Sequence, residues 1–425
     1  VEPTQRFGAS LASFDNAVYV GAPFAWDGDE VARGKVYQYG SNGIGPVATY
    51  EPQPASPTPN EDLFGWSIAA ESGYVAIGAP GDDRNGNFAG IVYIYPGASQ
   101  LVLAQPDDAA EWGRFCWAVA VDGEILVVGA PGDAFNGPSA GAVYLFEAGT
   151  GDQILQIRSP YGAPASSDFG RSVDIRGSRI IVGAARADVA GAVDVGQLFS
   201  YTFDAVSQTV SLDGVLNDPT PASNDRFGFS GAIGNSVTVV GTPSNDPTGE
   251  GFVFSNGIGS PFAQFRPSNT SGLGQFGDAV DSDGQRFAIG APNSSGGGQA
   301  FVFERPFEIL VQPRDFLAIP TDLIEIGIDL GFVQQPVTYL WRRDGIALTA
   351  DDGVQGLNTP VISFVADRTR DGLYDCVVTS GSVQLVSDPA LVAVRDTCPA
   401  DQNNDGLATP ADFNAWILNY NRGCD

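Results

Sequence analysis

The fold of this chain is decided by one stretch, Phe64-Gly-Trp-Ser-Ile-Ala-Ala-Glu-Ser-Gly-Tyr-Val-Ala-Ile-Gly78-Ala-Pro80. Phe64 and Gly78 are 14 residues apart, and a Phe and a Gly recur at this separation in five other places. The recurring pairs are Phe7 and Gly21, Phe115 and Gly129, Phe169 and Gly183, Phe227 and Gly241, and Phe276 and Gly290. A separation held through six copies predicts an array of equivalent units over residues 1–305.

Each unit contains a tight turn between two strand-like runs. The turn of the quoted stretch is Ser72-Gly73, and the others are Asp15-Asn16, Asp122-Gly123, Arg176-Gly177, Gly234-Asn235 and Asp283-Gly284. Asn and Gly tolerate the positive φ of two-residue hairpin turns, and a following Pro ends the second strand because it cannot donate to a ladder. A third run of large residues and a weaker fourth run come next, for example residues 91–95 and 100–104. Four short strands in ~50 residues are typical of one β-propeller blade.

These residues resemble the FG-GAP repeat family, known from the integrin α-subunit head and from bacterial surface proteins. Phe-Gly stands in five units and is Phe115-Cys116 in the third, and Gly-Ala-Pro stands in four. The resemblance implies an all-β chain whose first domain, residues 1–305, is an FG-GAP β-propeller of six blades. The integrin-type ring has seven blades, so a seventh remains open.

Integrin-type units carry a calcium loop between their first two strands. Here a two-residue turn fills that place, so we expect those sites to be missing. Acidic loops follow Gly-Ala-Pro instead, at Asp27-Gly28-Asp29, Asp82-Asp83 and Asp133. They lack the alternating ligand spacing and closing carboxylate of a calcium loop, so exposed acidic loops are expected in preference to cation sites.

Residues 306–396 are predicted to form a second domain. Trp341, and Tyr374 two residues before Cys376, are typical of an immunoglobulin-like β-sandwich. Tyr374 is expected to hydrogen-bond back to the main chain. No cysteine stands where Ile326 and Ile328 lie, so Trp341 is expected to pack on apolar side chains and a lone thiol. Cys116 is likewise read as a buried small residue.

Residues 397–425 carry the most specific chemical pattern, an EF-hand-type loop that starts at Asp401. Calcium takes six to eight hard oxygen ligands, and such a loop supplies them from positions 1, 3, 5, 7, 9 and 12, with Gly at position 6. Gly406 occupies position 6. The predicted ligands are Asp401, Asn403, Asp405, the Leu407 carbonyl, Thr409 and Asp412.

An apolar helical face follows this loop, at Phe413, Trp416, Ile417 and Tyr420. The segment resembles half of a dockerin, the calcium-dependent docking module of secreted bacterial proteins. A full dockerin has two such loops, and one is present. Cys398 and Cys424 bracket the segment and are expected to pair as a disulfide, which implies an oxidising compartment.

Composition excludes several classes of partner. The 425 residues include 50 acidic and 21 basic side chains, giving a formal charge of −29. Nucleic acids need a basic face, so none is expected as a partner, and no apolar run is long enough for membrane insertion. The sequence begins at Val1 and contains no Met, which is typical of a mature form whose leader was removed. We therefore expect a secreted, extracellular or cell-surface protein.

Catalysis is not expected, because without His the Ser-His-Asp, Cys-His and His-based zinc sites are excluded. The domain set favours a non-catalytic bacterial protein that acts in adhesion or as a structural unit of extracellular matrix, including a head-to-tail filament. Expected partners are calcium, an extracellular protein or polysaccharide, and other copies of the chain. Two alternatives stay open: an accessory component that binds carbohydrate or protein and docks through the calcium segment, and a glycan or phosphoester hydrolase using propeller carboxylates.

Overall fold

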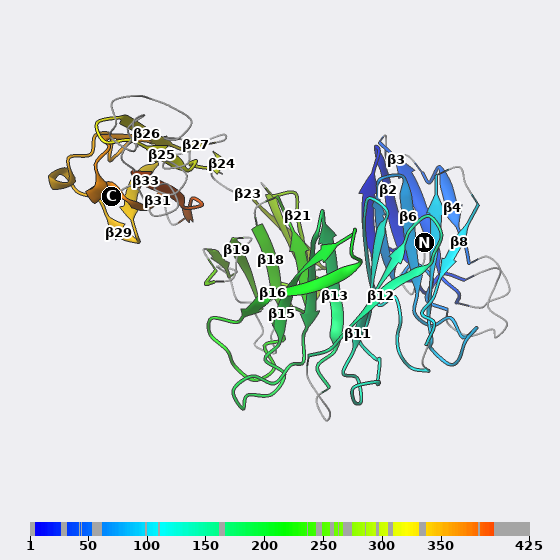
Figure 1. The fold of residues 1–425 in the computed structure, drawn as a ribbon. Helices are drawn as coiled ribbons and strands as arrows, with labels where there is room; N and C mark the ends of the chain where they lie inside the picture. The colour runs from blue at the N-terminus through cyan, green and yellow to red at the C-terminus, as the bar shows by residue number, and fades with distance from the viewer. Residues whose placement is uncertain are drawn as a thin grey trace, which may run out of the picture. The chain divides into compact units, whose positions relative to one another are not determined.

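A computed structural model of the chain divides into two compact units, Val1–Glu304 (unit 1) and Arg305–Asp425 (unit 2). Almost all regular structure is β-strand, as predicted (Figure 1). The structure describes residues 5–26, 32–41, 43, 45–52, 62–97, 100–108, 111–160, 166–235, 237–243, 249–255, 259–261, 263–266, 274–284, 286–294, 297–304, 309–330, 337–380 and 383–394.

Unit 1 consists of small antiparallel sheets, one for each predicted repeat, and each sheet follows chain order. The first three sheets are sheet 1, β1 (Leu11–Phe14), β2 (Ala17–Ala22), β3 (Lys35–Gly40) and β4 (Ala48–Tyr50); sheet 2, β5 (Ser67–Glu71), β6 (Tyr74–Ala79), β7 (Ile91–Pro96) and β8 (Val102–Ala104); and sheet 3, β9 (Ala118–Asp122), β10 (Ile125–Ala130), β11 (Ala142–Glu147) and β12 (Gln153–Arg158).

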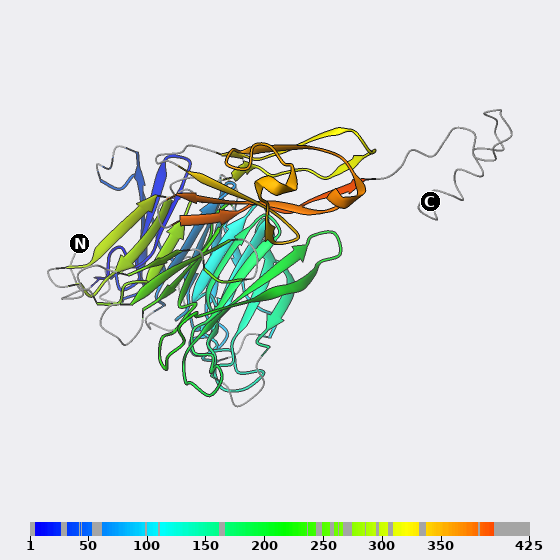
Figure 2. The same cartoon turned by 90° about the vertical axis from the view of Figure 1, so that its left-hand side faces the viewer.

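The last three sheets follow the same plan, with a fourth strand missing from sheet 6 within the described residues. They are sheet 4, β13 (Phe169–Arg176), β14 (Arg179–Ala184), β15 (Gln197–Asp204) and β16 (Thr209–Asn217); sheet 5, β17 (Ser230–Ile233), β18 (Val237–Thr242), β19 (Glu250–Ser255) and β20 (Ala263–Phe265); and sheet 6, β21 (Ala279–Ser282), β22 (Arg286–Ala291) and β23 (Gln299–Glu304). Successive sheets lie side by side in Figures 1 and 2.

The predicted hairpin turns are confirmed in position, with corrections in register. Asp15 and Asn16 both have positive φ, at 47° and 62°, which is the type I′ pattern. In sheets 3 and 4 the two turn residues begin at Gly123 and Gly177, one residue later than predicted, because Asp122 pairs with Ile125 and Arg176 with Arg179. In sheets 5 and 6 the last ladder pairs before the turn are Ile233 with Thr238 and Ser282 with Phe287.

Sheets 2 to 6 each bury the Phe of their own repeat against the preceding sheet. Phe115, Val119 and Leu126 of the third repeat pack on Ala76 and Ile94 of sheet 2. The same arrangement places Phe64 against sheet 1, Phe169 against sheet 3 and Phe227 against sheet 4. Burying one Phe contributes about 1.5–3 kcal/mol, so these faces hold the array together.

Glycine is required where two successive sheets meet. A Cβ on Gly183 would overlap the carbonyl oxygen of Gly228 in the next repeat. Gly21, Gly129 and Gly241 face the equivalent carbonyl in the same way, and in the third repeat Cys116 supplies the oxygen that Gly78 approaches. The spacing of 14 residues therefore places this Gly beside the next turn. We call this contact the glycine joint.

A serine hydroxyl reinforces four of the joints. Ser10, three residues after Phe7, donates to the Gly65 carbonyl oxygen at 2.7 Å. Ser67, Ser172 and Ser230 donate to the equivalent oxygens at 2.8, 2.9 and 2.8 Å. The carbonyl oxygen at each of these joints therefore accepts a hydrogen bond from the serine and also contacts the Cα of the joint glycine. A neutral buried hydrogen bond adds about 1 kcal/mol.

Unit 2 contains a mixed sheet of β25 (Phe316–Ala318), β33 (Ala390–Val394), β31 (Gly372–Ser380), β28 (Thr338–Arg343) and β29 (Ile346–Ala347), with β32 (Val383–Val386) beside β31. Two smaller pairs are β26 (Leu323–Gly327) with β30 (Val361–Val365) and β24 (Ile309–Val311) with β27 (Asp329–Leu330). Two 3₁₀ turns, η2 (Ala350–Asp352) and η3 (Arg368–Arg370), complete it.

The predicted core of unit 2 is confirmed at its main residues. Tyr374 donates its hydroxyl to the Arg370 carbonyl at 2.9 Å, the expected return hydrogen bond. Trp341 is buried, and its register partner across β28 and β31 is Cys376, a buried free thiol. Cys116 of unit 1 is also buried and free.

Replacing Gly183 by Ala is predicted to lower the free energy of unfolding by about 2–3 kcal/mol or more, since the neighbouring group is main chain and cannot rotate away. Chemical denaturation followed by circular dichroism measures the change. The control is Gly259→Ala, where a Cβ meets nothing within 4 Å and φ is ordinary. Equal stability of both variants would refute the glycine joint.

Candidate binding cavity of unit 1

The turn that opens each repeat has one conformation in all six. The residue before each Phe has positive φ, from 48° at Arg6 to 60° at Arg226 and Gln275. Its carbonyl accepts a hydrogen bond from the residue two after the Phe, as in Trp66 N to Leu63 O at 3.0 Å and Arg171 N to Asp168 O at 3.0 Å. Non-glycine residues rarely adopt this conformation, and it sets the side chain two after the Phe at the same place in every sheet.

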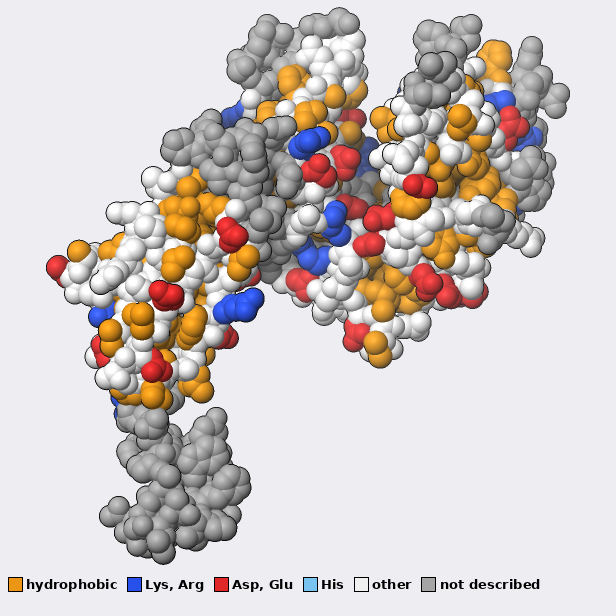
Figure 3. Space-filling model, turned by 90° about the horizontal axis from the view of Figure 1, so that it is seen from above, with side chains coloured by type: hydrophobic (Ala, Val, Ile, Leu, Met, Phe, Trp, Pro, Cys, Tyr) orange, Lys and Arg blue, Asp and Glu red, His pale blue; other side chains and the backbone are white. Residues whose placement is uncertain are grey.

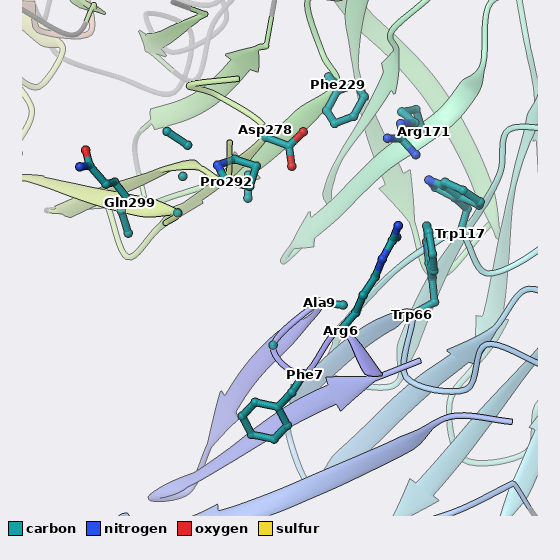
Figure 4. A pocket seen from close by; sticks show the side chains of 16 residues that line it. Arg6, Phe7, Ala9, Trp66, Trp117, Arg171, Phe229, Asp278, Pro292 and Gln299 are labelled. Carbon is teal, nitrogen blue, oxygen red and sulfur yellow. The ribbon is translucent and has the colours of Figure 1, made fainter. Parts of the chain in front are cut away.

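Those side chains line one cavity of about 780 Å³. Sheets 2 to 5 contribute Trp66, Trp117, Arg171 and Phe229, and the first and last repeats contribute Ala9 and Asp278 at the equivalent position. Arg6, Phe7, Pro292 and Gln299 complete the wall (Figure 4). Figure 3 shows unit 1 hollowed, with basic and acidic side chains beside the hollow.

Aromatic rings and a guanidinium form a row of successive contacts along one wall. The Trp66 and Trp117 ring centroids are 4.5 Å apart at an interplanar angle of 52°. The Arg171 guanidinium carbon lies 5.0 Å from the Trp117 centroid and 4.0 Å from the Phe229 centroid. Cation–π contacts of this kind are worth about 0.5–2 kcal/mol, so Arg171 is held in place by two rings.

Positive charge gathers at this wall of an otherwise acidic chain. Arg171 lies near Arg114 and Arg226, and burial together with these two charges lowers the pKa of Arg171 to about 10, against the opposing effect of Asp168 and Asp278. Burial raises the pKa of the Asp278 carboxyl. Among the described residues, Arg171 and Arg6 make no ion pair with a carboxylate.

The cavity opens between sheets 1 and 6, where the repeated packing is interrupted. Phe7, Leu11 and Val18 are 42%, 64% and 40% exposed. Their equivalents in sheet 2, Phe64 and Ile68 among them, are buried against the preceding sheet. Sheet 1 therefore presents one half of an inter-sheet contact.

The sequence predicted that the acidic loops after Gly-Ala-Pro are exposed, and this prediction is wrong at two of them. Asp82 and Asp133 are buried. Each carboxylate accepts from the main-chain N–H two residues on, at 3.1 and 3.0 Å, and from a tyrosine hydroxyl of the third strand, Tyr93 at 3.1 Å or Tyr144 at 2.9 Å. These hydrogen bonds satisfy the carboxylates and fix the loops. Asp27–Asp29 lie outside the described residues.

The predicted calcium ligands Asp401, Asn403, Asp405, Leu407, Thr409 and Asp412 lie outside the described residues, as do Cys398 and Cys424. No group of three or more acidic or cysteine side chains suited to a metal occurs in the part of the chain that is described. The same residues include no helix long and apolar enough to cross a membrane.

Sequence reasoning did not find the cavity residues. The signal was available, since Trp66, Trp117, Arg171 and Phe229 all stand two residues after the recurring Phe. The residue type at that position differs from repeat to repeat, so a search for repeated residues does not detect the position.

Comparison with known proteins finds FG-GAP repeats in two places. The FG-GAP repeat family matches residues 55–95 and 100–146. Such repeats are typical of extracellular or surface proteins and suggest an adhesion-type or modular extracellular protein. A search of curated proteins finds no match.

Solved structures similar to part of the chain are immunoglobulin-type or fibronectin-type domains at low coverage. Titin M4 is 15% identical, covering 21% of this chain and 94% of that one, with a TM-score of 0.19. Duf (Kirre) D1 is 13% identical, with 21% and 98% covered and a TM-score of 0.19. A chimeric titin Z1Z2 tandem is 14% identical, with 39% and 94% covered and a TM-score of 0.21.

Asp62 is expected to make the stability of unit 1 depend on pH. Burial, and next the charge of Asp82, raise the pKa of its carboxyl to about 7, although Arg33 lies 3.4 Å away. The folded state then binds the proton more tightly than the unfolded chain, so stability falls as pH rises from about 4 to about 7, by up to about 1.4 kcal/mol per pH unit.

The test is denaturation of the Asp62→Asn variant at pH 5 and pH 8. The variant should lose less stability between these values than the wild type, because the ionisable group is gone. The exposed Asp107 provides the control Asp107→Asn, which should keep the wild-type dependence. A wild-type slope in the Asp62→Asn variant would contradict the assignment.

Proposed function

We propose that the chain is a non-catalytic, secreted or cell-surface adhesion protein whose unit 1 is a six-bladed β-propeller that binds a partner in its axial cavity. The observation that carries the proposal is the cavity itself, to which all six repeats contribute a residue. The FG-GAP match supports the extracellular, adhesive class. A cavity built by every repeat is the natural binding place of a ring.

The ring is proposed to close by one more glycine joint, between sheet 6 and sheet 1. Sheet 1 offers the exposed Phe7, Leu11 and Val18. Sheet 6 offers Gly290, where a Cβ meets nothing closer than 3.5 Å, and the 66%-exposed Val302. These are the two halves of the contact made between all other neighbours. The same halves support head-to-tail pairing of copies if they meet between chains instead.

Unit 2 is proposed to be an immunoglobulin-like domain, supported by the Tyr374 hydrogen bond and the buried Trp341. The C-terminal segment is proposed to bind calcium through Asp401, Asn403, Asp405, Leu407, Thr409 and Asp412, on their spacing in the sequence. Bound calcium would neutralise the loop carboxylates.

A non-catalytic role is supported by the sequence, which has no His to act as a general base near neutral pH. The carboxylate of Asp82 is already committed to a tyrosine hydroxyl and to the main chain. The cavity contributes one carboxylate, that of Asp278, among its lining residues, whereas glycoside hydrolysis ordinarily uses two.

Adhesion is tested with beads that carry the full chain, incubated with intact cells of the source organism and with cells stripped of their extracellular polymer. We expect retention on the intact cells and loss on the stripped ones. Control beads carry an inert protein of similar negative charge, because repulsion from an acidic cell surface must be matched. Equal retention of both bead types would contradict an adhesive role.

Calcium binding is tested by isothermal titration of the full chain and of the double variant Asp401→Asn/Asp405→Asn. The wild type should bind with a heat that the double variant loses, because two charged ligands are removed. The control is Asp351→Asn/Asp352→Asn, an acidic pair outside the loop. Unchanged binding by the loop variant would refute the assignment of the site.

A further inference from the structure

The cavity wall combines three chemical features that point to one class of ligand. Trp66 and Trp117 offer aromatic faces. Arg6 and Arg171 offer guanidinium donors, and Asp278 offers a single acceptor carboxylate. Figure 4 shows these side chains arranged around the same space.

We propose that the axial cavity binds a carboxylated saccharide, such as the uronic acid units of an acidic extracellular polysaccharide. This inference rests on the adhesive function proposed above and names the chemistry of the partner.

The guanidinium of Arg171 is arranged to receive a carboxylate. Its guanidinium carbon lies over two aromatic rings, 5.0 Å from the Trp117 centroid and 4.0 Å from the Phe229 centroid. Among the described residues, no side chain or carbonyl accepts a hydrogen bond from the guanidinium N–H groups, and no carboxylate pairs with them. A guanidinium edge binds a carboxylate through two parallel hydrogen bonds. Contact with two rings restricts the Arg171 side chain before a ligand binds, which lowers the entropic cost of binding an anion.

The local charge also favours an anion, although the chain as a whole is acidic. The lining residues carry two guanidinium groups and one carboxylate. Arg114 and Arg226 add positive charge close to Arg171, while Asp168 opposes them. The Arg114 guanidinium lies over the Trp117 ring at 5.3 Å. The chain carries a net charge of −29, so a polyanion is attracted where basic side chains gather, as they do at this cavity.

The aromatic faces favour a sugar ring over other anions. A pyranose presents C–H bonds on one face, and these pack against the electron-rich face of an indole. Its hydroxyls can donate to the Asp278 carboxylate, which repels a simple anion but accepts from a hydroxyl. A volume of about 780 Å³ accommodates more than one sugar unit. An acidic polypeptide would use the charge but not the indole faces.

The test is isothermal titration of the full chain with oligogalacturonate, with a neutral oligosaccharide of the same length and with poly-glutamate. We expect binding of oligogalacturonate, at least tenfold weaker binding of the other two, and weakening with added salt. Arg171→Gln should reduce oligogalacturonate affinity at least tenfold. Arg6→Gln, at an exposed side chain, should reduce the affinity several-fold.

Arg158→Gln is the matched control, because its guanidinium also lies on an aromatic ring, 3.3 Å from the Phe135 centroid, but outside the cavity. It should bind oligogalacturonate like the wild type. Circular dichroism establishes that each variant is folded, and if Arg171→Gln is not, Arg6→Gln decides. Tighter binding of poly-glutamate would assign the cavity to acidic polypeptides and overturn the proposal.

The saccharide proposal would also be overturned if Arg6→Gln and Arg171→Gln bound oligogalacturonate as tightly as the wild type. It would be overturned as well if the wild type did not bind oligogalacturonate. If beads carrying the full chain are nevertheless retained on intact cells, the adhesive function stands and the saccharide assignment alone fails. If retention and titration both fail, the proposed function falls as well.

Discussion

Unit 1 depends on the approach of a main-chain carbonyl in one repeat to a bare Cα in the repeat before it. The contact of the Gly183 Cα with the Gly228 carbonyl is one example, and equivalent contacts join the other neighbouring sheets. No other residue fits, because a Cβ would occupy the position of the oxygen. The contact fixes the distance between sheets, so the Phe side chains fill the space between them and serine hydroxyls reach the same carbonyls.

The turn that forms each glycine joint also positions a residue of the cavity. The carbonyl that abuts the glycine belongs to the turn after each Phe, and that turn holds the next side chain toward the cavity. A rigid joint therefore presents a set of variable residues in fixed positions. The Arg171 side chain contacts both Trp117 and Phe229 because equivalent turns hold the main chain of all three residues in the same position within their repeats. The residues that stabilise the fold are therefore different from the cavity residues, which can vary between repeats without disturbing the joints.

The repeated part of the fold could be predicted from the sequence because its causes are local. The fixed separation of Phe64 and Gly78 and the turn residues between them gave the strands. The register of the turn at Gly123 was missed by one residue, since Asp and Gly both favour turns. The burial of Asp82 was missed because its partner, Tyr93, lies across a loop of irregular length. The cavity depends on six distant residues and could not be read from any one repeat.

The proposed closure of the ring, by one more glycine joint between sheets 6 and 1, can be tested at the sixth glycine, Gly290. Gly290 has room for a methyl group in the described structure, whereas closure would place the Gly8 carbonyl against it. The measurement is the free energy of unfolding of Gly290→Ala by chemical denaturation. If the ring is closed, this variant should lose about 2–3 kcal/mol, as expected for a joint between neighbours. Stability equal to that of the wild type would contradict closure of the ring.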